Sequence, residues 1–109
     1  MTVDELARSV DRLVGQIAQW TQSRWATSTA SGGGTRAAAV HALAQRLADL
    51  EAGLTGHPTH EVPRLESDLV LPDQVKVIAR DLLVAGPTPE VIADAAEAVA
   101  GTRSALNGT

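Results

Sequence analysis

The sequence predicts an all-α protein, specifically a small four-helix bundle built from two αα-hairpins with a long proline-containing crossing connection. Apolar residues recur at steps of three and four along most of the chain, as they do in helices that bury one face. Alanine, the best helix former, is the most frequent residue, and strand signals are absent. The 109 residues suit a single domain, 1–109, large enough to bury about two-thirds of its unfolded surface.

The first helix is expected over residues 3–27. Asp4 and Glu5 would lie in its first turn, where the helix dipole favours negative charge. Its apolar seam steps by three and four through Val3, Leu6, Val10, Leu13, Ile17 and Trp20. Residues 27–35 are almost all small and include three consecutive glycines, which predicts a flexible loop.

The second helix is expected over residues 35–54. Thr35 is a suitable N-cap, and Gly53 and Gly56 mark the end. The apolar positions are Val40, Leu43, Leu47, Leu50 and Leu54. Because only a short loop separates this helix from the first, the two are predicted to form an antiparallel hairpin.

Residues 55–71 form the predicted connection between the two hairpins. Pro58, Pro63 and Pro72 exclude a continuous helix. Val62 and Leu65 are nevertheless too apolar for a solvated linker. We therefore expect the connection to cross the end of the bundle and pack on it.

The third and fourth helices are expected over residues 72–85 and 89–107. Pro72 suits the first position of a helix, and Thr88-Pro89-Glu90 combines a cap hydroxyl, an N1 proline and an acid in the first turn. Val77 and Val84 widen the apolar stripe of the third helix until it is apolar on most sides. That helix would have more apolar surface than a monomeric bundle of short helices can cover.

Composition excludes several function classes. The chain has no cysteine, which excludes disulfides, thiolate metal sites and a cysteine nucleophile. A net charge of −4 and only two aromatic residues argue against nucleic-acid binding. No catalytic motif is present, so we expect no enzymatic activity and no cofactor. No apolar run could span a membrane and no signal peptide begins the chain, so we expect a cytoplasmic protein. The alanine, valine and arginine content suggests a bacterial source.

One cluster carries metal-ligand side chains. His57, His60 and Glu61 lie in the connection, and Asp68 or His41 could complete a zinc or nickel shell. The spacing matches no zinc-binding template, so a polar loop is the favoured interpretation. A small ligand- or metal-binding domain that uses residues 57–68 remains an alternative function.

A second alternative is a transcriptional regulator. Residues 82–93, followed by residues 101–104, loosely resemble a helix-turn-helix, with Gly86 at the turn. Leu82 stands where that motif has a small residue. Residues 73–109 contain five acidic and three basic side chains, a net charge of −2, which disfavours DNA binding. An ordinary pair of helices is therefore favoured.

The leading hypothesis is a non-enzymatic helical protein–protein interaction module, self-associating as a homodimer or serving as an accessory subunit. Trp25, Val77 and Val84 are the candidate contact residues. Trp25 lies five residues after Trp20, about 140° around a helix, and so leaves the apolar seam. It would either pack under the small-residue loop or anchor a partner.

Overall fold

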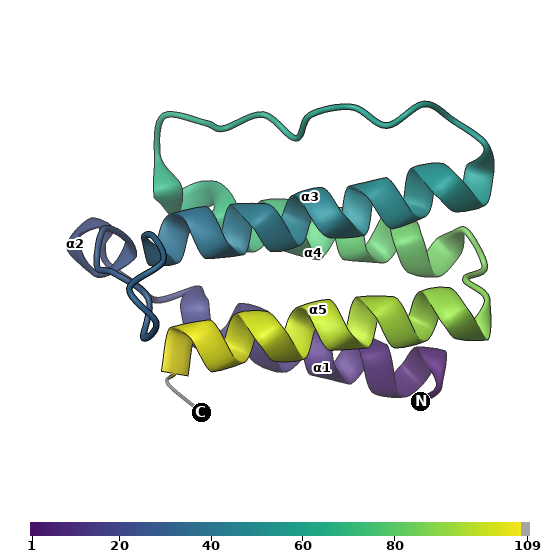
Figure 1. The fold of residues 1–109 in the computed structure, drawn as a ribbon, viewed down its shortest axis with the longest axis horizontal. Helices are drawn as coiled ribbons and strands as arrows, with labels where there is room; N and C mark the ends of the chain where they lie inside the picture. Colours follow the sequence, from purple (N-terminus) through teal and green to yellow (C-terminus); the bar gives the residue numbers. More distant parts are fainter. Residues whose placement is uncertain (108–109) are drawn as a thin grey trace.

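The computed structural model describes residues 1–107 of the chain, which contain five α-helices and one short 3-10 helix joined by loops (Figure 1). In chain order they are α1 (Val3–Ile17), α2 (Gln22–Trp25), α3 (Arg36–Thr55), η1 (Asp68–Val70), α4 (Leu71–Val84) and α5 (Pro89–Asn107). Within these residues there is no strand, only one isolated bridge between Ser28 and Thr35. The all-α prediction is confirmed.

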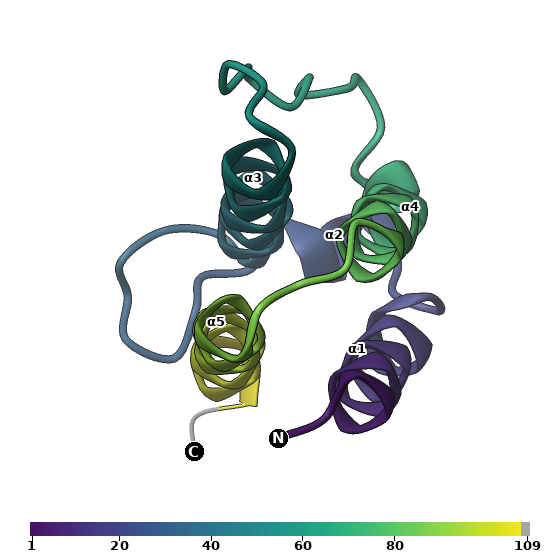
Figure 2. The ribbon, with the colours of Figure 1, turned by 90° about the vertical axis from the view of Figure 1, so that its right-hand side faces the viewer.

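The four long helices lie side by side, and α3 packs against its successor α4, whereas α1 and α3, and α4 and α5, are not packing pairs. Both α3 and α1 pack against α4 and α5, so α1 lies diagonally across from α3, and α4 across from α5 (Figure 2). The predicted pair of αα-hairpins is therefore not confirmed. Each helix instead packs mainly against helices from the other half of the chain.

The long connection also takes a different path from the predicted one. It leaves the end of α3, returns along the length of the bundle and enters α4 at the opposite end (Figure 1). Because α3 and α4 begin at the same end, they run parallel, and α1 and α5 run the other way. An extended chain gains about 3.3 Å per residue, so residues 56–70 have ample length for the return along a molecule whose longest dimension is 37 Å.

The first helix is shorter than predicted. It ends at Ile17 rather than near residue 27, and the backbone N–H of Trp20 donates to the carbonyl of Ile17. Thr21 then caps α2 by accepting from the backbone N–H of Arg24. This break turns the chain so that Trp20 and Trp25 both reach the core, which an unbroken helix would not allow.

Local capping chemistry explains most other helix ends. Thr2 and Glu5 form a reciprocal capping box at the start of α1. Thr35 accepts from the backbone N–H of Ala38 at the start of α3, and Thr88 accepts from that of Val91 near the start of α5. At the end of α3, Gly56 has φ 73°, the left-handed conformation that favours glycine.

Backbone hydrogen bonds hold the loop over residues 27–35 in place. The backbone N–H of Thr29 donates to Gly34, and that of Arg36 donates to Thr27. Ala30 also donates to the carbonyl of Ala105 in α5, at 2.9 Å. The loop therefore packs against the last turns of α5.

The core is built almost entirely from aliphatic side chains. Its largest fully buried members come from every long helix and from α2: Trp25, Leu6, Leu13, Ile17, Leu43, Leu47, Leu71, Leu82, Val40, Val75 and Val99. Small buried alanines, such as Ala44 and Ala95, let the helices approach closely. The aliphatic periodicity that predicted the helices also identifies most of this core.

Candidate functional site

The connection is fastened to α3 around Val62. The Gln45 side chain donates from Nε2 to the carbonyl of His60 and accepts at Oε1 from the backbone N–H of Val62, at 2.9 and 2.8 Å. One turn earlier on α3, His41 Nε2 lies 2.8 Å from the carbonyl of Val62. A carbonyl oxygen only accepts, so Nε2 is the protonated nitrogen of this ring. The Val62 side chain is buried between these contacts.

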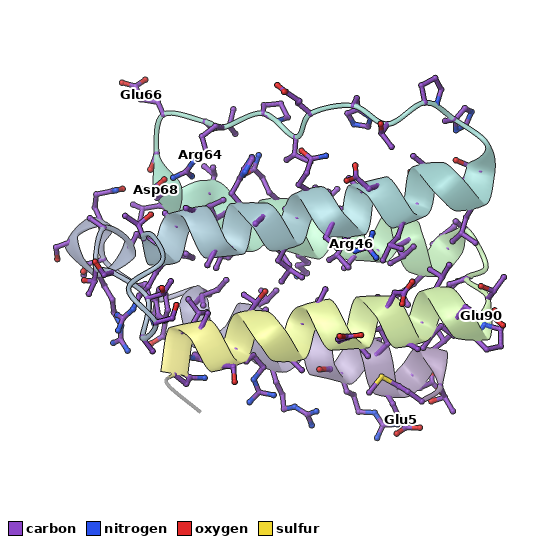
Figure 3. The ribbon with its side chains drawn as sticks, viewed as in Figure 1. Glu5, Arg46, Arg64, Glu66, Asp68 and Glu90 are labelled. Carbon is purple, nitrogen blue, oxygen red and sulfur yellow. The ribbon has the colours of Figure 1, made fainter. Side chains whose placement is uncertain are left out.

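Further contacts hold the connection at its α4 end. Gln74 Nε2 donates to the carbonyl of Pro63 at 3.0 Å. Arg64 pairs with Asp68 at 2.8 Å, and Gln22 of α2 donates to the second carboxylate oxygen of Asp68, also at 2.8 Å (Figure 3). Glu66, between the two paired residues in sequence, points away from the bundle (Figure 3). The connection therefore follows one defined path over α3 and α4.

A groove of about 560 Å³ lies between the connection, α3 and α4. Most of its lining side chains are apolar: Ala48, Val62, Pro63, Leu65, Val70, Val77 and Ile78. Two of the large hydrophobic side chains among them are substantially exposed, Leu65 at 46% and Val77 at 57%. A pocket of this size and apolar character is the usual form of a binding site.

The polar side chains around the groove are mostly acidic. They are Glu51, Asp73 and Asp81, together with His60 and Gln74. Among residues 1–107, no lysine or arginine lines the groove. A second, more polar hollow beside it shares His60 and adds the carboxylates of Asp49 and Glu61. Carboxylates are therefore the prevailing charged groups around the two hollows.

The structure does not bring the candidate metal ligands together. His57 Nδ1 lies 2.8 Å from the Thr55 hydroxyl, whereas His60 and Glu61 line the polar hollow. His41 and Asp68 are engaged in holding the connection. Within residues 1–107, no three histidine or carboxylate side chains are placed to share a metal ion.

Trp25 requires a correction as a candidate contact residue. Its side chain is fully buried, and its ring packs edge-on against Trp20 with the centroids 4.9 Å apart. The guanidinium groups of Arg24 and Arg36 lie over Trp20, at 4.9 and 5.3 Å from its ring centroid. Trp25 is therefore part of the core, and a partner could not reach it without unfolding this end of the molecule.

Val77 and Val84 lie at the surface. They are 57% and 82% exposed. Seven residues separate them, so they lie on the same side of α4, with Asp81 between them. Val77 lines the groove, whereas Val84 lies beyond the lining residues, at the end of α4.

The remaining alternatives gain no support from the geometry. Helices α4 and α5 lie at diagonal corners of the bundle, and each packs against α1 and α3 (Figure 2). In a helix-turn-helix the two helices instead cross each other. None of the helices within residues 1–107 has the length and apolar character needed to cross a bilayer.

The sequence identifies the groove only in part: residues 57–68, the alternative ligand- or metal-binding segment, include His60 and Leu65 of its lining, but nothing in the sequence joins them to Val77 on α4. Leu65 stands out only as too apolar for a linker, and the acids fit solvated helix faces equally well. The available signal is the occurrence of apolar residues in a proline-rich connection beside a helix apolar on most sides. No protein-family model, curated protein or solved structure matches the chain.

Proposed function

We propose that the chain is a non-enzymatic protein–protein interaction module whose contact surface is the groove between the connection, α3 and α4. The observation that carries this proposal is the exposure of Leu65 and Val77 inside an apolar groove, with Val84 exposed beyond it on the same side of α4. Exposed apolar surface of this kind marks interaction sites on otherwise polar proteins. The side-chain contacts that hold the connection give the groove a preformed wall, which lowers the entropic cost of binding.

Self-association through two facing grooves is less favourable than contact with a different chain. A symmetric pair would bring Glu51, Asp73 and Asp81 of one copy toward the same carboxylates of the other. Like charges brought together at an interface are unfavourable. An accessory subunit that binds another protein is therefore the form of the hypothesis we favour.

Site-specific photo-crosslinking in the producing cell tests this function. A photoreactive phenylalanine replaces Val77 in the groove, and in a matched control it replaces Glu97, an exposed residue of α5. We expect discrete heavier products from position 77 and none from position 97. A product of twice the chain mass would instead identify self-association.

A second variant links the products to the groove. With the photoreactive residue at Val84, the products should disappear when Val77→Asp is added, since a buried charge would weaken apolar contact. Circular dichroism of that variant should remain unchanged because Val77 is exposed. Equal products from positions 77 and 97, or none from position 77, would overturn the proposed function.

A further inference from the structure

The apolar surface exposed by the chain is concentrated beside the groove. Within residues 1–107, the exposed large hydrophobic side chains are Met1, Val3, Leu65, Leu69, Val77 and Val84. The first two belong to the N-terminus, and the other four belong to the connection, η1 and α4. Leu65 and Val77 line the groove, and Val84 lies about two turns beyond Val77 on the same side of α4.

The acidic side chains around the groove favour an occupant that carries positive charge. Asp73 and Asp81 lie eight residues apart on one side of α4, with Val77 midway between them, and Glu51 faces the groove from α3. Arg64 is paired with Asp68, and Lys76 and Arg80 line a different hollow, between α1 and α4. Three carboxylates around an apolar centre therefore fit a cationic, apolar occupant and disfavour a second acidic copy of this chain.

The spacing along α4 fits a second helix. Asp73, Val77 and Asp81 succeed each other at four-residue steps, about 6 Å each. A helix lying along α4 would present a basic, an apolar and a basic side chain at the same steps. The two carboxylates would then each meet a cation while the central apolar residue contacts Val77.

The hydrogen bonding of the connection disfavours an extended occupant. The carbonyls of His60, Val62 and Pro63 and the N–H of Val62 already bond to side chains of α3 and α4. An extended peptide would find few backbone partners along this wall, and its own amides would be left unpaired in an apolar groove. A helix satisfies its backbone hydrogen bonds internally.

We propose that the groove binds a short helical segment of a partner protein in which apolar residues are flanked by lysine or arginine. This inference rests on the proposed interaction function and specifies the chemistry of the partner. The segment needs about three helical turns, since residues 73–84 of α4 extend over about 17 Å.

Three synthetic peptides of equal length test the inference by titration against ¹⁵N-labelled full-length protein. The first has lysine, leucine and lysine at four-residue steps, the second replaces lysine by glutamate, and the third is the lysine peptide with a central proline. We expect the lysine peptide to shift the backbone amides of Leu65 and Val77. The glutamate and proline peptides should bind at least tenfold more weakly.

Matched variants locate the contact. Asp73→Asn with Asp81→Asn should weaken binding of the lysine peptide about tenfold and reduce its salt dependence. The control, Asp11→Asn with Glu97→Gln, makes the same change in net charge away from the groove and should leave the affinity within twofold. Equal weakening by both double variants would overturn the inference, because only net charge would then matter.

The other outcomes assign different occupants. If the proline peptide bound as tightly as the lysine peptide, the occupant of the groove would be an extended segment. If octylamine displaced the lysine peptide at concentrations equal to those of the peptide, the occupant would be a small apolar cation. Groove amides that shift with protein concentration alone would mean a second copy. Each result overturns the helical cationic segment, as would failure of the lysine peptide to bind. The interaction function itself would still be decided separately by crosslinking from position 77.

Discussion

Trp20 and Trp25 are the only aromatic side chains of the chain, and both are buried at the same end of the bundle. The break between α1 and α2 brings them together, because a continuous helix would separate them by about 140°. The Trp25 indole N–H has no hydrogen-bond partner among residues 1–107. Packing rather than hydrogen bonding therefore accounts for what Trp25 contributes to stability.

Substitution of Trp25 tests this assignment. Trp25→Ala should lower the free energy of unfolding by about 3–5 kcal/mol, since it empties a fully enclosed site. Trp25→Phe should cost less than half as much, because a ring remains and an unpaired buried donor is removed. Urea titration followed by circular dichroism measures both, with the exposed Arg24→Ala as a control that should cost about 1 kcal/mol or less. A loss below about 1 kcal/mol for Trp25→Ala would contradict the core assignment.

The Gln45 side chain holds the connection by two hydrogen bonds, one to the carbonyl of His60 and one from the N–H of Val62. Gln45→Ala should leave the Val62 N–H without its acceptor and lower stability by about 1–3 kcal/mol. The more specific readout is hydrogen exchange, in which the Val62 amide should lose protection before the amides of α3. The matched change Gln19→Ala, at an exposed residue of the α1–α2 turn, should alter neither quantity. Unchanged protection at Val62 would show that the connection is held by other contacts.

At the scale of the elements, helix limits were more predictable than helix partners. The range of α5 coincides with residues 89–107 because Thr88 and Pro89 act locally at its start. Periodicity shows which face of a helix is buried but not which helix covers it, so the diagonal placement of α1 and α3 could not be read from the pattern. The groove depends on that placement and on the path of the connection. Of its residues, only Val77 was identified as a contact candidate from sequence.

Two glycines in helical segments should respond oppositely to alanine. Gly56 ends α3 with φ 73°, so Gly56→Ala should cost about 1 kcal/mol. Gly101 lies inside α5, and no neighbouring element in the described part of the chain, residues 1–107, comes within 4 Å of the position that an alanine methyl group would take. Gly101→Ala should therefore stabilise by about 0.5–1 kcal/mol. Thermal unfolding of both variants in the same buffer provides the comparison. Changes of the same sign would show that the end of α3 is not as described.

At the scale of the whole molecule, the packing pairs make folding a joint property of both halves of the chain. Helices α1 and α3 come from the first half, yet each packs against α4 and α5 from the second (Figure 2). A bundle of two hairpins would allow each half to retain its own paired core. The diagonal arrangement leaves neither half with its main packing partners.

Dividing the chain within the exposed part of the connection distinguishes these arrangements. Fragments 1–58 and 59–109 should each lack a cooperative thermal transition by circular dichroism, because isolated short helices are only marginally stable in water. Mixed in equal amounts, they should recover a cooperative transition that shifts upward with concentration. The Trp25→Ala version of fragment 1–58 serves as the control and should recover it poorly. Cooperative unfolding of fragment 1–58 alone would instead mean that α1 and α3 pair directly, as the sequence alone predicted.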